Sequence, residues 1–430
     1  MYWEQSVQCE AETDIGLRRK NNEDAYSIHL CPNETVFRQS GHLVLVADGM
    51  GGHAVGELAS RIAAETVPHT FLKSGIAEPR RSLAEAIQAA NKAINSRGTQ
   101  NADFLHMGTT CTALALTTHG AVIGHVGDSR AYRIRRDRVD QMTFDHSLEW
   151  EMERQHADLA GTIDLSQHKN VITRSLGPEA VIDVDIEGPF PVLPGDIFVL
   201  CSDGLSNQVT DSEMGAIARE LPPKTAARLL IDLANIRGGP DNSTVLVVKI
   251  GEMPANVVPT LPEQVVDERQ ELGWSWLFAF AGVGMLLVFS LMMQYFGRPI
   301  LGSLLFALSV TGLLAVVAAS IRQKNRLRQA YRSEDTHTHL WRPHRTAVGL
   351  SSKDLADRLL ATDQELLRSA KEDGWDVDWD AHDQSISAAR QAVEERRYSR
   401  AVRDAAKAIR VIMEELPRRL TARNNAQSPT

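Results

Sequence analysis

Cysteine is scarce in this 430-residue chain, and its four cysteines are too few and too scattered to form a disulfide framework. No two of them have the Cys-x-x-Cys spacing of a zinc or redox motif. We therefore expect a reduced, cytoplasmic environment for residues 1–250. The first ten residues, MYWEQSVQCE, have no basic start followed by an apolar run, so we expect no cleaved signal peptide.

Clusters of basic residues are also missing from the first part of the chain. Residues 1–250 contain 23 Lys and Arg against 33 Asp and Glu, whereas the rest of the chain contains 23 against 22. A surface that binds nucleic acid needs clustered Lys and Arg to neutralise phosphates, so nucleic acid is excluded as a main partner. Apolar residues make up 43% of the chain and charged residues 23%, which excludes a disordered or fibrous chain and predicts two or three domains.

One long stretch almost lacks charge. Residues 274–321 contain a single charged side chain, Arg298. A turn at residues 297–299 divides the stretch into two apolar segments, Trp274–Phe296 and Ile300–Ile321. As helices, both segments are long enough to cross a hydrocarbon core of roughly 30 Å. Since two such segments are adjacent, a buried helix of a globular domain explains them less well, and they predict a transmembrane hairpin.

Lys and Arg residues directly after the hairpin favour the cytoplasmic side for its end, and a hairpin returns to the side where it begins. We therefore predict a two-pass protein of the inner (cell) membrane, with the N-terminal and C-terminal regions in the cytoplasm. The predicted segments are a globular domain (1–250), a Pro-containing linker (251–273), the hairpin (274–321), a basic juxtamembrane linker (322–349), a cytoplasmic helical region (350–420) and a disordered tail (421–430). The helical region is a candidate for binding a partner or for self-association.

Aspartates recur at the ends of strand-like apolar runs in residues 1–250. Asp48, Asp128 and Asp203 follow such runs, and Asp241 precedes one. Carboxylates on turns at strand ends can converge at one edge of a sheet system. Converging acids need a compensating cation, and oxygen ligands without His or Cys favour Mg²⁺ or Mn²⁺. A lone Asp-Gly is usually only a turn, but four such turns indicate a metal site and leave several metal-dependent folds open.

Nine short motifs follow one another in a distinctive order over about residues 5–250. They are TDIG (13–16), RKNNEDA (19–25), VADGMGGH (46–53), GTT (108–110), GDSR (127–130), DHS (145–147), TRSLG (173–177), SDGL (202–205) and DNST (241–244). Each motif is weak alone, but the ordered set resembles the metal-dependent Ser/Thr protein phosphatases of the protein phosphatase 2C (PPM) family, in the bacterial form. The resemblance implies an α+β fold, an α/β/β/α sandwich of two antiparallel sheets flanked by helices. The two transmembrane helices and a small α-helical region would follow it.

The resemblance also implies two Mg²⁺ or Mn²⁺ ions and the residues that hold them. Asp48 corresponds to the carboxylate that bridges the two ions, and the Gly49 carbonyl to a ligand of one of them. Asp203 and Asp241 correspond to ligands of the second ion. The implied reaction is hydrolysis of phosphoserine and phosphothreonine in proteins by a metal-bridged water, which needs no protein nucleophile. None of the four cysteines is followed six residues later by arginine, which argues against a cysteine-dependent phosphatase.

The remaining site residues come from the same resemblance. Glu23 and Asp24 correspond to residues that hold metal-bound waters. Arg19 corresponds to the catalytic guanidinium that grips the substrate phosphate, a task for which its planar fork of donors is suited. Asp128 corresponds to a residue that helps bind a weaker third ion in bacterial relatives. The implied partners are phosphorylated proteins and a membrane-bound, Hanks-type Ser/Thr kinase.

One position departs from the animal-type pattern, in which a histidine follows the Asp-Gly and is proposed as the general acid. Met50 occupies that position here and cannot donate a proton, which leaves a metal-bound water, His53 and His146 as candidates. For both histidines a structural role in a turn is the stronger expectation. Residues 148–169 correspond to a mobile flap beside the active site.

Two other functions compete with this interpretation. A phosphatase of the haloacid-dehalogenase type needs an Asp-x-Asp arrangement, which Gly49 and Met50 after Asp48 do not supply. A catalytically inactive, membrane-anchored adaptor that binds phosphoproteins is the alternative from a different class. Such degenerate members usually lose metal ligands, whereas Asp48, Asp203 and Asp241 are all present.

Overall fold

The structure is a computed structural model of the chain. It describes residues 7–51, 54–75, 77–101, 104, 107–155, 171–251, 274–313 and 343–415. The chain divides into two compact units, one formed by residues 1–260 together with 341–430 and the other by residues 261–340. Residues 341–430 therefore belong to the same unit as the N-terminal domain.

Two antiparallel sheets form the centre of the first unit. Sheet A has the strand order β1 (Val7–Asp14), β11 (Ser243–Ile250), β10 (Ile197–Cys201), β7 (Arg130–Arg135), β8 (Arg138–Gln141) and β12 (Arg345–Val348). Sheet B has the order β2 (Asp24–His29), β3 (His42–Met50), β5 (Cys111–Thr117), β6 (Gly120–Val126) and β9 (Asp185–Phe190), with β4 (Gly108–Thr109) paired to β3.

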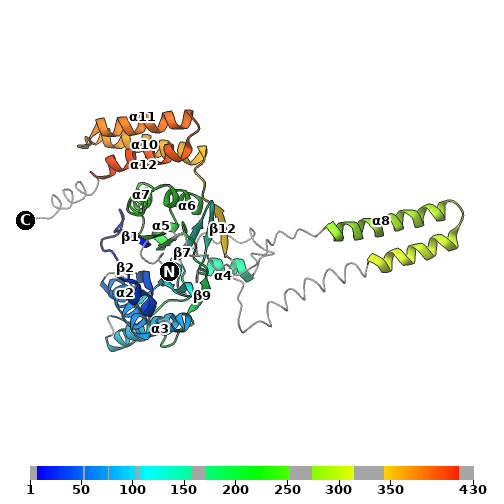
Figure 1. Ribbon diagram of the computed structural model, residues 1–430, viewed down its shortest axis with the longest axis horizontal. Helices are drawn as coiled ribbons and strands as arrows, with labels where there is room; N and C mark the ends of the chain where they lie inside the picture. Colours follow the sequence, from blue (N-terminus) through cyan, green and yellow to red (C-terminus); the bar gives the residue numbers. More distant parts are fainter. Residues whose placement is uncertain are drawn as a thin grey trace, which may run out of the picture. The chain divides into compact units, whose positions relative to one another are not determined.

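Helices cover the outer face of each sheet (Figure 1). Helices α2 (Ala54–Ser74) and α3 (Pro79–Gln100) lie against sheet B, whereas α6 (Asp211–Glu220) and α7 (Pro223–Ile236) lie against sheet A. Three shorter helices are α1 (Glu34–Ser40), α4 (Leu148–Gln155) and α5 (Asp203–Ser206). The predicted α+β sandwich of two antiparallel sheets flanked by helices is confirmed.

Strand β3 shows how the sequence builds this sandwich. Leu43 and Leu45 pack with the apolar side chains of α2 and α3, whereas Val44 and Val46 pack between the two sheets. Successive side chains of a strand point to opposite faces, so a strand that is buried on both faces needs a continuous apolar run. The run ends at Asp48, where the strand reaches the edge of the sandwich.

Helix α6 has a well-defined beginning and a buried carboxylate. Thr210 caps it by accepting the backbone N–H of Glu213, whose side chain in turn accepts the backbone N–H of Thr210. The Glu213 carboxylate is 2% exposed and pairs with Arg237 at 2.9 Å. Arg358 of the C-terminal region approaches the same carboxylate at 3.6 Å, which gives an ionic contact between the two regions.

The C-terminal region forms helices α10 (Lys353–Glu372), α11 (Trp379–Glu394) and α12 (Tyr398–Met413). Leu355, Val402 and Ile409 belong to the same buried apolar cluster as side chains of α6 and α7. The chain was predicted to have a linker over residues 322–349, but residues 345–348 form strand β12 on the edge of sheet A. The helical region is therefore packed on the N-terminal domain, a contact that composition alone did not indicate.

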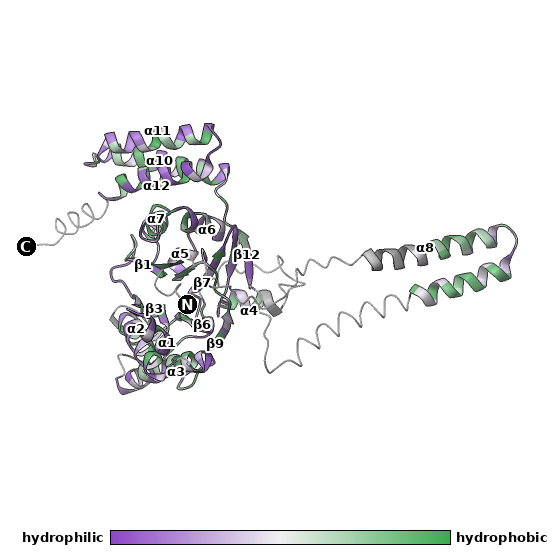
Figure 2. Cartoon of the chain, in the orientation of Figure 1, coloured by the Kyte–Doolittle hydropathy of each residue, from purple (hydrophilic) through white to green (hydrophobic). Residues whose placement is uncertain are grey.

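The second unit contains α8 (Trp274–Tyr295) and a helix over residues 299–313. Figure 2 colours most of the described part of α8 as hydrophobic, and Met285 and Val288 on it are 75% and 61% exposed. Ser290 Oγ donates to the Gly302 carbonyl at 3.0 Å, which joins the two helices. Among the residues with described placement, however, none of the helices combines the length and the apolar character that a membrane crossing requires.

The prediction of a transmembrane hairpin is therefore not confirmed. Two helices joined by a turn are present, as predicted. Residues 314–321 of the predicted second span, however, lie outside the described residues. The same is true of residues 252–273 of the predicted linker and of the predicted tail at 421–430.

Candidate active site

The strand ends bring five aspartates to one edge of the sandwich. Asp24 begins β2 and lies directly opposite Asp48 of β3 in the strand register. The others are Asp128 after β6, Asp203 at the start of α5 and Asp241 before β11. Each of the other four aspartates raises the pKa of Asp48 through its charge. These residues, called the acidic cluster below, include all four aspartates that the strand-end pattern predicted.

Burial and mutual repulsion disfavour the ionised forms of these acids. Burial, together with its four acidic neighbours, raises the pKa of Asp48 well above its ordinary value. Burial raises the pKa of Asp24 to about 7, with a further rise from the charges of Asp203 and Asp241. Burial and the charges of Asp203 and Asp145 raise the pKa of Asp128 to about 8. When these acids are ionised, the cluster therefore carries more negative charge than the nearby basic side chains neutralise.

Hydroxyl groups fix two of the aspartates. Ser202 Oγ donates to Asp24 Oδ2 at 2.8 Å and accepts the backbone N–H of Thr244 at 2.9 Å. Thr110 Oγ1 accepts the backbone N–H of Asp48 at 2.8 Å, and Thr109 Oγ1 donates to the Asp48 carbonyl at 2.9 Å. These bonds position the backbone of Asp48 and the carboxylate of Asp24.

Asn242 joins the two ends of the N-terminal domain at the cluster. Its Oδ1 accepts the backbone N–H of Glu23 at 2.8 Å, and its Nδ2 donates to the carbonyls of Ile15 and Asn21 at 2.9 and 3.0 Å. Gly204 lies so close to the Asn242 carbonyl that a Cβ at this glycine would be only 1.9 Å from it. The side chain after Asp241 therefore fixes the loop that carries Glu23.

Gly49 and Glu23 meet the first turn of α2. A Cβ at Gly49 would lie 2.2 Å from the Gly56 carbonyl oxygen, so only glycine fits there. The Gly49 backbone N–H donates to the Glu23 carbonyl at 3.1 Å. A Cβ at Gly56 would lie 2.4 Å from Glu23 Oε2, which puts this 8%-exposed side chain against the start of α2. The positive end of the helix dipole favours a carboxylate there.

Arg19 lies at the exposed side of the cluster. Its Nη2 donates to Asp241 Oδ2 at 2.6 Å, and the two side chains are 49% and 32% exposed. A solvent-accessible guanidinium beside the acids can bind an incoming anion. The structure thus brings Arg19 together with Asp241.

The residues present fit hard divalent cations. Asp24 Oδ1 and Asp128 Oδ1 are buried without a hydrogen-bond partner within the described ranges. The carboxylate oxygens outnumber the basic side chains that could pair with them, and Mg²⁺ and Mn²⁺ prefer oxygen ligands of this kind. The fit is one of donor chemistry and charge: in the described part of the chain, no three His, Cys, Asp or Glu side chains form a group that could hold a metal ion by itself.

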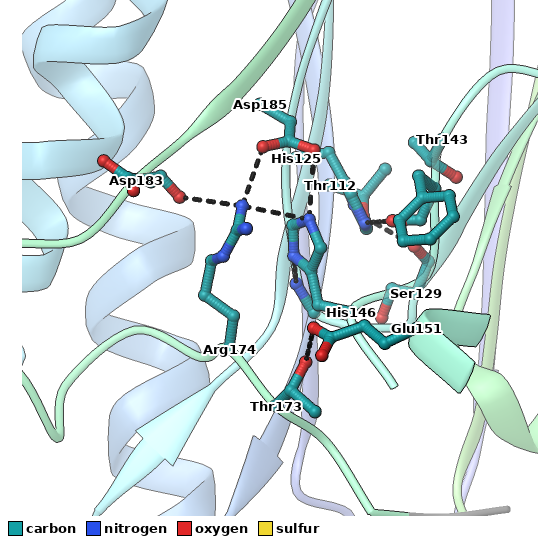
Figure 3. Close-up of polar contacts among 12 residues, drawn as sticks. Thr112, His125, Ser129, Thr143, His146, Glu151, Thr173, Arg174, Asp183 and Asp185 are labelled. Carbon is teal, nitrogen blue, oxygen red and sulfur yellow. Dashed lines mark hydrogen bonds and ion pairs between the residues drawn. The ribbon is translucent and has the colours of Figure 1, made fainter. Parts of the chain in front are cut away.

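His146 has a structural environment (Figure 3). The side chain is 1% exposed, and its Nδ1 accepts the backbone N–H of Gly127 at 3.0 Å. In the neutral ring the proton is then on Nε2, which lies 3.1 Å from Asp185 Oδ2 and 3.1 Å from Arg174 Nη1. Arg174 donates to the other Asp185 oxygen at 2.7 Å. His146 thus joins the turn before Asp128 to strand β9.

A second buried histidine packs beside His146. The two rings are 4.8 Å apart, and His125 Nε2 donates to the Phe144 carbonyl at 2.9 Å. Burial and the charge of His146 lower the pKa of His125 to about 3. Both histidines are held inside the domain, which supports the expectation that His146 has a structural role.

Three other predicted features have different outcomes. Met50 ends β3 opposite Gly108 of β4. His53 lies outside the described residues, as do residues 156–169 of the predicted flap. The flap begins with helix α4, and Thr173 Oγ1, four residues beyond its predicted end, donates to Glu151 Oε1 of α4 at 2.6 Å.

Comparison with known proteins gives the family. The sequence profile described as "Protein phosphatase 2C" matches residues 18–235. The chain belongs to the protein phosphatase 2C family. The "Serine/threonine phosphatase stp" of Listeria innocua is 37% identical over 257 residues, which cover 56% of this chain and 96% of the relative. "Protein phosphatase PhpP" of Streptococcus pneumoniae is 33% identical over 56% of this chain and 97% of its own length.

A solved structure agrees with this membership. The S. agalactiae serine/threonine phosphatase is 32% identical, covers 57% of this chain and 99% of its own, and has a TM-score of 0.51. The catalytic domain of another similar protein, the serine threonine protein phosphatase PstP, has been solved in complex with two manganese ions. The present chain is a metal-dependent Ser/Thr protein phosphatase of this family.

The supporting residues were harder to predict than the acids. Asn242, Ser202 and Thr110 lie within the motifs DNST, SDGL and GTT, but the sequence does not say which atoms they contact. Arg130 pairs with Asp145 at 2.7 Å and lies within the motif GDSR, which likewise does not show this contact. The only sequence signal for these contacts is adjacency to a predicted aspartate.

Proposed function

We propose that the acidic cluster is a dinuclear metal site at which phosphoserine and phosphothreonine in proteins are hydrolysed. Asp48 would bridge the two ions, the Gly49 carbonyl would bind one, and Asp203 and Asp241 would bind the other. The main support is that Asp48, Asp203 and Asp241 come from separate strand ends and that the first two are linked through Asp24, which lies directly opposite Asp48 and accepts a hydrogen bond at 2.8 Å from Ser202, the residue before Asp203.

Other residues of the site would complete it. Glu23 and Asp24 would hold waters on the ions, and Asp128, whose Oδ1 is buried without a partner among the described residues, would bind a third ion. Arg19 would bind the substrate phosphate, because its exposed guanidinium lies beside Asp241. Because the acids are buried and Arg19 is exposed, a phosphate would enter from the side of Arg19.

When bound, the ions would make water a nucleophile at neutral pH and offset charge on the phosphoryl oxygens. The chain itself would orient the phosphate through Arg19. Met50 cannot supply a proton, and the Nε2–H of His146 is directed to Asp185. The general acid would therefore be a group other than these two side chains.

An inactive phosphoprotein-binding adaptor is the other candidate, but it does not need five converging acids. Buried carboxylates that repel one another destabilise a fold unless a ligand compensates them. An adaptor would be more stable with neutral residues at these positions. The intact cluster therefore favours an enzyme.

Metal removal tests the proposed function. With EDTA, the full chain is expected to lose hydrolysis of p-nitrophenyl phosphate and of a phosphothreonine peptide, and added Mn²⁺ or Mg²⁺ should restore both. Cations that bind only the folded state also raise the melting temperature, by mass action. The measurements are steady-state rates and thermal unfolding with and without Mn²⁺. Full activity in EDTA, or a melting temperature that Mn²⁺ leaves unchanged, would refute the metal site.

We also propose that the chain is attached to the inner membrane through residues 274–321, with both flanking regions in the cytoplasm, and that it acts on substrates of a membrane-bound Ser/Thr kinase. The support is the single charge in that stretch and the exposure of apolar side chains such as Ile300, which is 80% exposed. Wild-type chain is expected to sediment with membranes after carbonate washing, and a chain with Leu301 and Leu304 changed to Lys should be released. Equal recovery of both in the soluble fraction would contradict the attachment.

A further inference from the structure

The beginning of helix α12 borders a surface pocket of about 420 Å³. Of the described residues that line it, none is acidic and four are arginines: Arg396, Arg397, Arg400 and Arg403. The whole chain has a net charge of −9, yet residues 396–410 contain six basic side chains and one acidic side chain. Pockets of this size commonly hold small ligands. This one, called the arginine pocket below, favours an anion.

A carboxylate of the phosphatase domain holds two walls of the arginine pocket. Glu220 Oε1, at the end of α6, accepts hydrogen bonds from Ser351 Oγ at 2.9 Å and from Ser399 Oγ at 3.0 Å. Both serines line the pocket. The Glu220 side chain is 11% exposed and also pairs with Arg219 at 3.0 Å. The arginine pocket is therefore anchored to the phosphatase domain by a network of hydrogen bonds.

The positive charge of the pocket is only partly compensated. Arg397 pairs with Glu395 at 3.3 Å, and Arg400 lies 3.4 Å from an aspartate four residues later on α12. Within the described part of the chain, Arg396 and Arg403 take part in no ion pair. Two guanidinium groups in one pocket are thus available to bind an external anion.

Arg396 occupies a backbone position that favours glycine. It directly follows the residue that caps the end of α11 and has a φ of +57°. Helices often end with a residue in this left-handed conformation, and that residue is usually glycine because a Cβ is disfavoured there. Replacement of Arg396 by glycine therefore removes a cation of the pocket while the turn keeps its conformation.

Phosphate groups have the chemistry that such a pocket recognises. A planar guanidinium donates two parallel hydrogen bonds to a phosphate, and clusters of arginine recognise phosphorylated side chains in many proteins. A phosphorylated serine or threonine carries a charge of about −1.5 to −2 at pH 7, more than a carboxylate carries. Binding to a membrane surface would instead combine basic with exposed apolar side chains, and residues 351–415, all of them described, expose no large apolar side chain.

We propose that the arginine pocket binds a phosphorylated serine or threonine in a segment of the substrate protein, and so keeps the substrate on the folded unit that contains the acidic cluster. This docking role rests on the proposed function. A substrate held in this way reaches the acidic cluster at a higher effective concentration. All the arginines of the pocket lie beyond residue 235, where the family match ends, so family membership does not predict this site.

Binding of a fluorescent phosphothreonine peptide to the full chain in EDTA tests the proposal. Without metal ions the acidic cluster repels a phosphate, so fluorescence anisotropy reports binding elsewhere on the chain. The double variant Arg396→Gly/Arg403→Ala is expected to bind at least about 10-fold more weakly, because hydrogen bonds to a charged group are stronger than neutral ones. Arg396→Gly alone should keep the melting temperature of the wild type. Arg368→Ala is the matched control, since this 81%-exposed arginine of α10 does not line the pocket.

Two further measurements identify the anion. The same peptide without its phosphate should bind the wild type at least about 10-fold more weakly than the phosphopeptide. Vesicles of phosphatidylglycerol and phosphatidylcholine should bind the wild type and the double variant equally. Equal binding of the phosphopeptide by the wild type and the double variant, or a loss confined to vesicle binding, would overturn the proposal.

Turnover separates this proposal from the proposed function. With Mn²⁺, the double variant is expected to hydrolyse p-nitrophenyl phosphate as fast as the wild type, whereas KM should rise for a protein that carries several phosphoserines, such as phosphorylated casein. An unchanged KM for that protein would overturn the docking role. If the wild type hydrolysed neither substrate, the proposed function would fail, but the anisotropy comparison would still decide whether the arginine pocket binds a phosphorylated residue.

Discussion

Asp48→Asn is expected to lower kcat/KM for a phosphothreonine peptide more than about 100-fold, because replacement of groups that only support metal ligands already costs about 10- to 100-fold. The change removes one negative charge from a cluster whose members raise the pKa of Asp48. Without metal at neutral pH, the variant should therefore melt at a higher temperature than the wild type. Steady-state kinetics and thermal unfolding measure the two effects.

This pair of outcomes distinguishes loss of function from loss of fold. Asp137→Asn is the matched control, since Asp137 is an exposed aspartate in the turn between β7 and β8, away from the acidic cluster. It should keep wild-type activity.

In cells, Asp48→Asn is expected to increase phosphorylation on serine and threonine, which phosphoproteomics measures. An active Asp48→Asn enzyme would contradict the proposed role of this residue.

Ile409→Ala is expected to destabilise the phosphatase domain although residue 409 lies in the C-terminal region. Ile409 is fully buried in the apolar cluster that includes Leu229 and Leu233 of α7. Removal of such a side chain leaves a cavity and typically costs about 2–5 kcal/mol. Urea unfolding followed by both circular dichroism and residual activity would measure the loss of free energy.

Lys407→Ala is the control for the same helix. The Lys407 side chain is 65% exposed and pairs with Asp404 at 2.8 Å, so its removal should change the free energy of unfolding by no more than about 1 kcal/mol. If Ile409→Ala changed stability as little as Lys407→Ala, or if activity survived at urea concentrations that unfold α12, the two regions would not be one cooperative unit.

The acids could be predicted from the residues because their signals are local, whereas the sandwich was predicted through the resemblance to a family. Asp48 ends a continuous apolar run, and Asp203 and Asp241 stand in turns beside similar runs, so strand-end geometry alone suggested that they converge. The continuous apolar run in β3 indicates a strand that is buried on both faces. The roles of Gly49 and Arg19, by contrast, came from the resemblance to a family, since a glycine or an arginine has no local signature of that kind.

Features that depend on contacts between distant segments were not predictable. Residues 345–348 form too short a run to indicate a strand, and they are one because β8 offers an unpaired edge. The buried face of α12 carries Ala401, Ala405 and Ala408, but nothing in the sequence indicates that α7 is its partner.

The order of strands in sheet A has a consequence for the continuity of the chain. Strand β11 ends at Ile250 and β12 begins at Arg345, so the polypeptide between them is an insertion into one folded unit. Cleavage of a peptide bond within that insertion would leave two fragments held together by β-pairing, by the Glu213–Arg358 contact and by a shared apolar core. The protein would then behave as a non-covalent complex of these two fragments.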